Sequence, residues 1–277
     1  MSERAALSAG AVLAWAVPGL RDLPWRATRD PWRVLVAEVM LQQTQTGRVV
    51  PAWHEFCAAY PTPAACAGAP LGDVLRMWQG LGYPRRARDL HGAAGRIVAV
   101  HGGEVPDDLE ALLALPGVGS YTARAVLAFA FERDIAVVET NIARLLARVA
   151  GERLTTRRVQ AMADSLVPAG DGWVWNQALM DLGATVCRPV PRCDECPVRG
   201  SCRWHLAGRP EPDPAAGSAG VSVRQAPYEG SDRQARGRVL HRLAAGSAPA
   251  DEFPARIVAG LVEDRLVVRA GAELSLP

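Results

Sequence analysis

The sequence predicts a mainly α-helical fold that ends in a small tail with the pattern of a winged helix. From about residue 5 to residue 205, apolar residues recur every three or four positions and strand-like alternation is absent. Clusters of Pro, Gly and Asp, such as PTPAACAGAP and HGGEVPDD, interrupt this pattern at short intervals. With 277 residues, 49% of them hydrophobic, the chain can bury a sizeable core in two or three compact parts.

The N-terminal stretch MSERAALSAGAVLAWAVPGLRD predicts an amphipathic helix. It carries acids, lacks the basic start and the cleavage site of a secretory signal, and is too short to span a bilayer. We therefore expect a cytoplasmic protein without membrane contact.

The C-terminal quarter predicts a linker followed by a small separate domain. Residues 207–220, AGRPEPDPAAGSAG, have a linker composition without periodicity. In the tail, DRQARGRVLHRLAAG and FPARIVAGLVED predict two helices, and RLVVRAGAELSLP predicts two short strands around Ala270 and Gly271. This order suggests a truncated winged helix.

The charged residues exclude one class of mechanism. A net charge of +2 is too small to indicate nucleic-acid binding by itself. The sequence contains no lysine, so every fixed side-chain cation is an arginine. A reaction that needs a lysine nucleophile is therefore excluded.

Four cysteines predict a metal site. Cys187, Cys193, Cys196 and Cys202 are separated by five, two and five residues. Cytoplasmic thiols so close together are poor candidates for disulfides. Structural zinc usually draws on two close pairs, whereas these spread thiols suit the four corners of an iron–sulfur cubane. A zinc site and a reduced cysteine cluster remain the alternatives.

The segment LPGVGSYTARAVLAFAF predicts a helix-hairpin-helix. Gly117, Val118 and Gly119 follow one apolar helix, and a second helix begins at Ser120 or Tyr121. Glycines permit the tight turn, and the amides at the start of the new helix form an anion site for a DNA phosphate. The alternative is a plain connection between two helices.

Two acids stand beside apolar runs. Glu38 is the single acid in VAEVMLQQTQ, where it interrupts a run typical of a buried helix. In VVETNIARLLARV, Glu139 and Asn141 precede a helix that Thr140 or Asn141 can cap. Taken alone, Glu139 is more typical of a helix start than of a catalyst.

These residues together carry a resemblance to a known family. The segments LPWR, AEVMLQQTQ, GLGYPRRARDLH, LPGVGSYTA, VVETNIARL, NQALMDLGATVC and the cysteine group resemble, in order and spacing, the MutY branch of the helix-hairpin-helix DNA glycosylases. Those are adenine glycosylases that act opposite oxidised guanine. The resemblance covers about residues 20 to 205. It implies a six-helix barrel beside a helical domain that carries a 4Fe-4S cluster bound by the four cysteines.

The resemblance assigns roles in glycosidic cleavage by base flipping. It implies that Glu38, held in an apolar pocket that raises its pKa, protonates the flipped adenine. Glu139 stands where the family has aspartate and would stabilise the sugar cation, as the second carboxylate does in glycosidases. Asn141 would bind beside Glu139. Tyr121 occupies the position of the Schiff-base lysine in relatives with lyase activity, so we expect a monofunctional enzyme.

Further positions match residues that contact the DNA. Arg26 would face the adenine, and Gln43, Thr44, Leu81 and Tyr83 would fill the duplex and contact the opposite base. The same resemblance implies that Gly117, Val118 and Gly119 bind the backbone. The family commonly has a second aromatic residue where this chain has Pro84. Alternatively, Leu81 and Tyr83 belong to the core and Gln43 is a solvated helix residue.

The resemblance predicts the domain boundaries and the partner. We expect an iron–sulfur helical domain over 1–30 and 133–206, a barrel over 31–132, a linker over 207–223 and the tail over 224–277. The expected partner is double-stranded DNA with a mispaired or damaged base, bound by a monomer in the bacterial cytoplasm at the nucleoid. A thymine or uracil mismatch glycosylase and a DNA damage-binding protein without catalysis are the alternatives.

The chain departs from the family in its first cysteine gap and in its tail. The gap is five residues where the family usually has six, and the tail is too short for the Nudix-like domain that reads oxidised guanine in many members. We expect the tail to add salt-dependent affinity for any DNA. The arginines that would do so are Arg224, Arg233, Arg236, Arg238 and Arg242.

Overall fold

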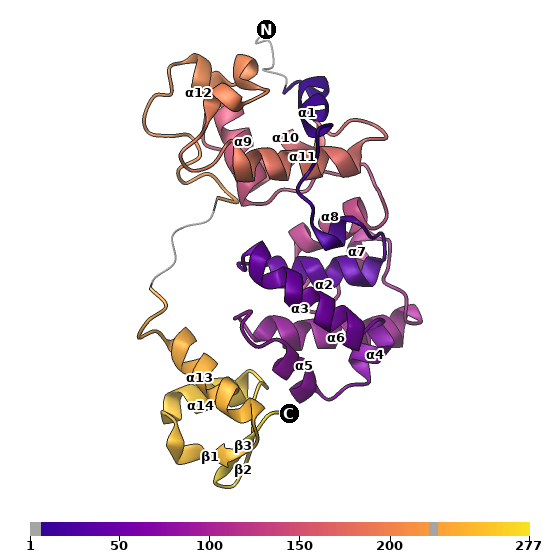
Figure 1. The fold of residues 1–277 in the computed structure, drawn as a ribbon, viewed down its shortest axis with the longest axis vertical. Helices are drawn as coiled ribbons and strands as arrows, with labels where there is room; N and C mark the ends of the chain where they lie inside the picture. Colours follow the sequence, from indigo (N-terminus) through magenta and orange to yellow (C-terminus); the bar gives the residue numbers. More distant parts are fainter. Residues whose placement is uncertain (1–6, 222–226) are drawn as a thin grey trace. The chain divides into compact units, whose positions relative to one another are not determined.

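The computed structural model describes residues 7–221 and 227–277 and is mainly helical, as predicted (Figure 1). The chain divides into two compact units. Unit 1 comprises Met1–Arg26 and Arg124–Arg224, and unit 2 comprises Ala27–Ala123 and Gln225–Pro277. The tail thus groups with the residues expected to form the barrel.

Unit 1 is built around α9 and α11, which pack on each other, while α1 packs on α11 and α12 on α9. Its core contains Ile142, Leu146, Trp175 and Leu182. The elements of the unit are α1 Ala9–Ala16, η1 Pro24–Arg26, α9 Thr140–Ala150, α10 Thr156–Asp164, α11 Gly172–Thr185, η2 Cys193–Glu195, η3 Arg199–Ser201 and α12 Arg203–Leu206. The helix α8 Ser120–Phe129 runs across the division between the units.

The expected linker is only partly a linker. Asp213 accepts hydrogen bonds from the buried Arg148, and Ser218 Oγ accepts one from the amide of Leu154 at 3.0 Å. The amide of Ala219 donates to the Leu154 carbonyl at 2.9 Å. Residues 213–219 therefore pack within unit 1, because the buried guanidinium of Arg148 requires a carboxylate as its partner. The Pro-rich composition of the segment gave no sign of this structural role.

Unit 2 begins with α2 Pro31–Leu41, whose start follows from its sequence. Pro31 occupies the first turn, where no amide donor is needed, and Asp30 accepts hydrogen bonds from the amides of Trp32 and Arg33. The other helices before α8 are α3 Thr46–Ala59, α4 Pro63–Ala67, α5 Leu71–Met77, α6 Arg85–His101 and α7 Leu109–Leu113. The helix α6 packs against α2, α4 and α5, so it lies at the centre of this group of helices (Figure 1).

The tail has the helix and strand order of a truncated winged helix. It consists of α13 Asp232–Ala244, β1 Ala248–Pro249, η4 Ala250–Glu252, α14 Ala255–Glu263, β2 Val268–Ala270 and β3 Glu273–Ser275. The two predicted strands are confirmed as β2 and β3, which form an antiparallel hairpin with Arg269 opposite Leu274. The strand β1 pairs with β3 and completes a sheet in the order β1-β3-β2.

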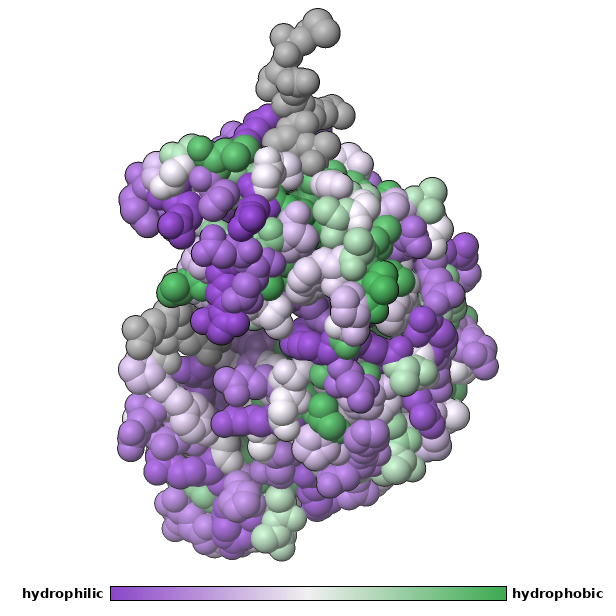
Figure 2. Space-filling view, turned by 45° about the horizontal axis from the view of Figure 1, so that its top comes forward, coloured by the Kyte–Doolittle hydropathy of each residue, from purple (hydrophilic) through white to green (hydrophobic). Residues whose placement is uncertain are grey.

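Hydrophilic and apolar residues are mixed over the face shown in Figure 2. Within residues 7–221 and 227–277, no helix is long and apolar enough to cross a membrane.

Candidate active site

Glu38 lies near the end of α2 and is buried. Its side chain is on a helix whose residues from Val34 to Met40 are all buried, and Glu38 itself is 4% exposed. One of its carboxyl oxygens, Oε2, is buried away from solvent.

Two loops of unit 2 carry Gln43, Thr44, Leu81 and Tyr83, and they are directly joined. Thr44 Oγ1 donates a hydrogen bond to the Leu81 carbonyl at 3.1 Å. Gln43 is exposed, Thr44 and Tyr83 are half-buried, and Leu81 is buried. Of these four residues, the structure thus brings Thr44 and Leu81 into contact.

Arg86, on the first turn of α6, ties the same loops together. Its Nη1 donates to the carbonyls of Val39, Met40 and Gln42 at 2.9, 2.8 and 2.6 Å. Its Nη2 donates to Thr44 Oγ1 at 2.9 Å and to the carbonyls of Leu81 and Gly82 at 3.0 and 2.9 Å. Burial lowers the pKa of Arg86 to about 10, which still leaves it charged at neutral pH.

The backbone of both loops adopts an unusual conformation. Gln43 has φ +57° and Tyr83 has φ +49°, in the left-handed region that non-glycine residues seldom occupy. Such conformations persist only where the surroundings hold them. The hydrogen bonds of Arg86 to both loops supply that restraint.

The helix-hairpin-helix is formed by α7, residues 114–119 and α8. Gly117 has φ +73°, and a Cβ at this position would lie 2.7 Å from Cβ of Asp89 on α6, so the turn requires glycine. Val118 is buried and its amide donates to the Leu115 carbonyl. The amides of Gly117 and Gly119 donate to no acceptor within the part of the chain that the structure describes. They are the donors available for an anion.

Glu139 is the N-cap of α9 in unit 1. Its Oε2 accepts from the amide of Asn141 at 2.8 Å and its Oε1 from the amide of Ile142 at 2.9 Å. The sequence had suggested Thr140 or Asn141 for this cap. Burial raises the pKa of Glu139, and this effect exceeds the opposing effects of the two amides and of the nearby Arg144 and Arg21.

Asn141 is held by an arginine that also reaches the cysteine loop. Asn141 Oδ1 accepts from Arg144 Nη2 at 2.6 Å, and the same nitrogen donates to the Gly183 carbonyl at 2.6 Å. Arg144 Nε donates to the Cys187 carbonyl at 2.7 Å. The start of α9 and the first cysteine are therefore joined through one guanidinium.

Arg26 lies in unit 1 and Tyr121 in unit 2. Arg26 forms a two-pronged ion pair with Asp181, with both N–O distances at 2.8 Å, and Arg21 Nε donates to the same carboxylate at 2.6 Å. Burial opposes the charge of Asp181, but these arginines outweigh it and hold its pKa below the usual range. Tyr121 lies half-buried in the first turn of α8.

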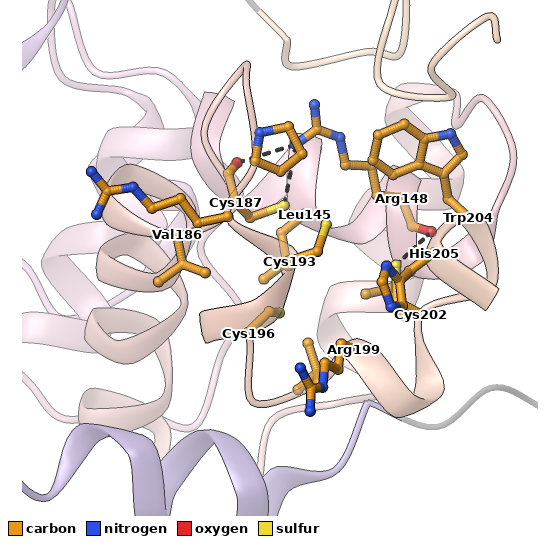
Figure 3. Close-up of a pocket in the computed structure, with 14 residues that line it drawn as sticks. Leu145, Arg148, Val186, Cys187, Cys193, Cys196, Arg199, Cys202, Trp204 and His205 are labelled. Carbon is orange, nitrogen blue, oxygen red and sulfur yellow. Dashed lines mark hydrogen bonds between the residues drawn. The ribbon is translucent and has the colours of Figure 1, made fainter. Parts of the chain in front are cut away.

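The four predicted cysteines line one pocket of unit 1 (Figure 3). Cys187 and Cys202 are buried, and Cys193 and Cys196 are half-buried. Burial raises the pKa of Cys196 to about 11. Among the described residues, no three His, Cys, Asp or Glu side chains form a group that could hold a single metal ion.

Arg148 of α9 forms one wall of this pocket. Its Nη1 lies 3.4 Å from Cys187 Sγ (Figure 3). Through the same nitrogen, Arg148 donates to the Arg188 carbonyl at 2.7 Å. Its Cζ lies 4.8 Å from the ring centroid of Trp204, and its Nη2 pairs with Asp213. The cysteine loop is thus fixed by a buried cation.

Sequence reasoning missed the residues that hold these sites in shape, namely Arg86, Arg148, Asp181, Asp213 and Asp264. The segment YPRRAR contains three arginines, and nothing in it singles out Arg86 as the buried one. Asp213 stands in a segment of linker composition. The only available signal was the lack of lysine, which leaves arginine to make every buried cationic contact.

Comparison with known proteins identifies the family. The model for "HhH-GPD superfamily base excision DNA repair protein" matches residues 36–176. An adenine DNA glycosylase of Mycobacterium tuberculosis is 45% identical over 246 residues, which cover 86% of this chain and 79% of that protein.

Solved structures agree with this result. A thermostable thymine-DNA glycosylase is 31% identical with a TM-score of 0.69, covering 72% of this chain and 94% of its own. An endonuclease III–DNA complex, 24% identical with a TM-score of 0.63 and covering 72% of this chain and 95% of its own, shares the fold. The chain therefore belongs to the HhH-GPD superfamily of base excision DNA repair proteins, as a DNA glycosylase of the MutY-type, adenine DNA glycosylase branch.

Proposed function

We propose that this protein removes adenine mispaired with 8-oxoguanine or guanine from double-stranded DNA, by flipping the base and hydrolysing its glycosidic bond. The burial of Glu38 in an apolar helix carries the proposal, because purine release needs a proton donor near neutral pH. The similarity to adenine DNA glycosylases supports the choice of base.

In the proposed reaction, Glu38 donates its proton to N7 of the flipped adenine. The electron pair of the C1′–N9 bond then leaves with the base, and the sugar becomes an oxocarbenium ion. Water adds to C1′ and loses a proton, which leaves an abasic site. Since the chain has no lysine, no Schiff base forms and the strand stays intact.

Glu139 is proposed to stabilise the oxocarbenium ion. Its carboxylate accepts two backbone amides at a helix N-terminus, an arrangement that favours the anion, although burial opposes it. Asn141, held by Arg144, would bind beside it. Tyr121 would occupy the position of the Schiff-base lysine in relatives with lyase activity, and Arg26, which pairs with Asp181, would face the adenine.

Discrimination of the opposite base is assigned to Gln43, Thr44, Leu81 and Tyr83. These residues lie on the two loops that Arg86 connects. Gln43 and Tyr83, which are exposed and half-buried at strained backbone positions, suit insertion into a duplex. Gly117, Val118 and Gly119 would hold a DNA phosphate through the hairpin turn. The protein would act as a monomer in the cytoplasm, at the nucleoid.

The four cysteines are proposed to hold a 4Fe-4S cluster. The donor set fits, because four thiols surround one pocket whose wall includes Val149, Val198 and Trp204. When bound, such a cluster would cross-link the loop from Cys187 to Cys202 and add one-electron redox chemistry. Protein purified without oxygen should contain about four irons per chain, and stoichiometric zinc without iron would refute this assignment.

A second candidate keeps the fold and changes the base. The likeness to a thymine-DNA glycosylase favours removal of thymine or uracil mispaired with guanine. A pyrimidine has no N7, so in that reaction Glu38 would lack its proposed acceptor.

A cleavage panel separates these candidates. Duplexes with adenine, thymine or uracil opposite guanine and opposite 8-oxoguanine are incubated with the protein and then treated with alkali to break abasic sites. We expect strand breaks with adenine, and only after alkali. Breaks confined to thymine or uracil would establish the second candidate, and binding without breaks in any duplex would indicate a DNA damage-binding protein.

A further inference from the structure

The tail docks on the helices that flank the Tyr83 loop. Residues 78–84 connect α5 to α6, and both helices contact the tail. The amide of Gly72 on α5 donates to the Pro277 carbonyl at 2.8 Å, and Arg76 Nε donates to the Ala244 carbonyl at 3.2 Å. A Cβ on Gly72 would lie 2.4 Å from the Pro277 oxygen, so this close approach requires glycine.

Asp264 forms the centre of the docking contact. Asp264 is 8% exposed. Its carboxylate pairs with Arg85 of α6 at 2.7 Å and with Arg236 of α13. Its backbone carbonyl accepts from Arg88 of α6 at 2.7 Å. Two arginines of α6 and one of the tail therefore meet at Asp264. The two α6 arginines, Arg85 and Arg88, lie in the first turn of the helix that follows the Tyr83 loop.

One tail side chain reaches Tyr83 itself. Arg233 Nη1 donates to the Tyr83 hydroxyl at 3.2 Å, and its Nη2 lies 3.4 Å from the Pro227 carbonyl. Tyr83 has a left-handed backbone and is followed by Pro84. The phenol ring is thus contacted by Arg233 at its hydroxyl, while Cζ of Arg86 lies 5.5 Å from its ring centroid.

Three of the tail arginines that we expect to contact DNA have partners within unit 2. Arg236 pairs with Asp264, Arg242 lies 3.6 Å from Glu252, and Arg233 contacts Tyr83. Arg238 is exposed and has no partner within the described chain. Arg224 lies outside the described residues. Arg236 and Arg242 thus pair with carboxylates of the tail, whereas the partner of Arg233 is the Tyr83 hydroxyl.

We propose that the tail is part of the opposite-base reader: docked through Asp264, it uses Arg233 to position Tyr83, and so it sets the preference between 8-oxoguanine and guanine without contacting the base. Arg233 is a positioning residue in this scheme. The inference rests on the proposed function for the role of Tyr83, whereas the docking and the Arg233–Tyr83 contact stand independently of it.

The test compares two full-length variants that each remove one charge from α13. Arg233→Met removes the contact to Tyr83, and Arg238→Met is the matched control. Tyr83→Phe deletes the same hydrogen bond from the other side. Single-turnover cleavage of adenine opposite 8-oxoguanine and opposite guanine is measured for each, together with hydrogen–deuterium exchange of residues 81–88 in the free protein.

Arg233→Met and Tyr83→Phe should each lower the ratio of the two cleavage rates by about fivefold, the worth of one hydrogen bond. The double variant should be no worse than either single one, because both remove the same bond. Exchange in residues 81–88 should quicken for Arg233→Met. Arg238→Met should leave the ratio and the exchange unchanged.

The proposal is overturned if Arg233→Met behaves like Arg238→Met in both measurements. It is also overturned if exchange quickens while the ratio stays constant, since the tail would then stabilise the loop without affecting discrimination. If the wild-type protein cleaves neither adenine duplex, the proposed function fails. The exchange measurement then still decides whether Arg233 positions Tyr83.

Discussion

Two buried arginines, Arg148 of unit 1 and Arg86 of unit 2, are stabilised in different ways. Arg148 in unit 1 is 2% exposed and pairs with the Asp213 carboxylate. Arg86 in unit 2 is 9% exposed, and its described partners are five carbonyls and one hydroxyl, with no carboxylate among the described residues. Burial lowers the pKa of Arg86, whereas Asp213 and Cys187 outweigh burial and raise that of Arg148.

The difference indicates what each arginine does. The attraction between two opposite charges depends little on the exact backbone conformation around them. Arg148 therefore acts as a staple that joins α9 to the segment around Asp213. Carbonyl dipoles bind a guanidinium only when several converge in the right geometry. Arg86 therefore makes the conformation of loop 42–44 depend on that of loop 81–83. The two proposed catalytic carboxylates also differ, because two backbone amides donate to Glu139, whereas Glu38 is buried near the end of α2.

The largest expected effect is on catalysis, and it compares these carboxylates. Glu38→Gln and Glu139→Gln should each slow adenine release by at least about a hundredfold in single-turnover assays while DNA binding persists. The first change removes the proton donor and the second removes the negative charge beside C1′. A near-normal rate for Glu139→Gln would leave Glu139 as a helix cap only.

Restoring the family residue sharpens this comparison. Glu139→Asp keeps the charge and is also a good N-cap, so it should retain or improve the rate. Strong loss of activity in Glu139→Asp would show that the longer side chain is required in this chain.

The next effect is on stability and concerns Arg148. Arg148→Met removes the cation that pairs with Asp213 and leaves the carbonyls of Arg188 and Pro189 without their donor, and we expect a loss of about 3 kcal/mol in the free energy of unfolding. Adding Asp213→Asn should restore part of it, because the uncompensated carboxylate is then gone. Denaturant titration of the proteins as purified measures both losses, and Arg157→Met on the exposed side of α10 is the control. Equal losses of unfolding free energy in the single and double variants would disprove the proposed role of the Arg148–Asp213 pair as a staple.

A smaller loss is expected for Arg86→Lys. An ammonium keeps the charge but lacks the planar fork, so it cannot reach both loops at once. We expect a loss of about 1–2 kcal/mol in the free energy of unfolding, because several carbonyls lose their donor. The preference for 8-oxoguanine should fall as well. Arg96→Lys, an exposed change on the same helix, should affect neither property, and an unaltered preference in Arg86→Lys would argue against coupled loops.

The smallest expected effect is on thermal stability at acidic pH. The folded-state pKa of Asp181 is depressed by Arg26 and Arg21, so its contribution to stability is complete above the unfolded pKa of about 3.9 and is lost as the pH falls through the folded value. Asp181→Asn should therefore flatten the decline in thermal midpoint below about pH 4. An unchanged slope would show that this pair does not contribute.

The sequence by itself determined the helical class, the hairpin turn and the positions of the four cysteines. These features depend on local pattern: Asp30 and Pro31 start α2, Gly117 permits the turn, and apolar periodicity buries Glu38 with its neighbours. The two strands around Ala270 and Gly271 were predicted for the same reason.

Only the tertiary structure decided which charged residues meet. The pairs Arg148–Asp213, Arg26–Asp181 and Arg236–Asp264 join residues 28 to 155 positions apart. Among 31 arginines, no local signal distinguishes a buried guanidinium from a solvated one. An ion pair is specified by where helix packing places its two partners, and a sequence pattern records only which residues are neighbours along the chain. The contact between Arg233 and Tyr83 is of this kind, since it exists only because the tail docks on α5 and α6.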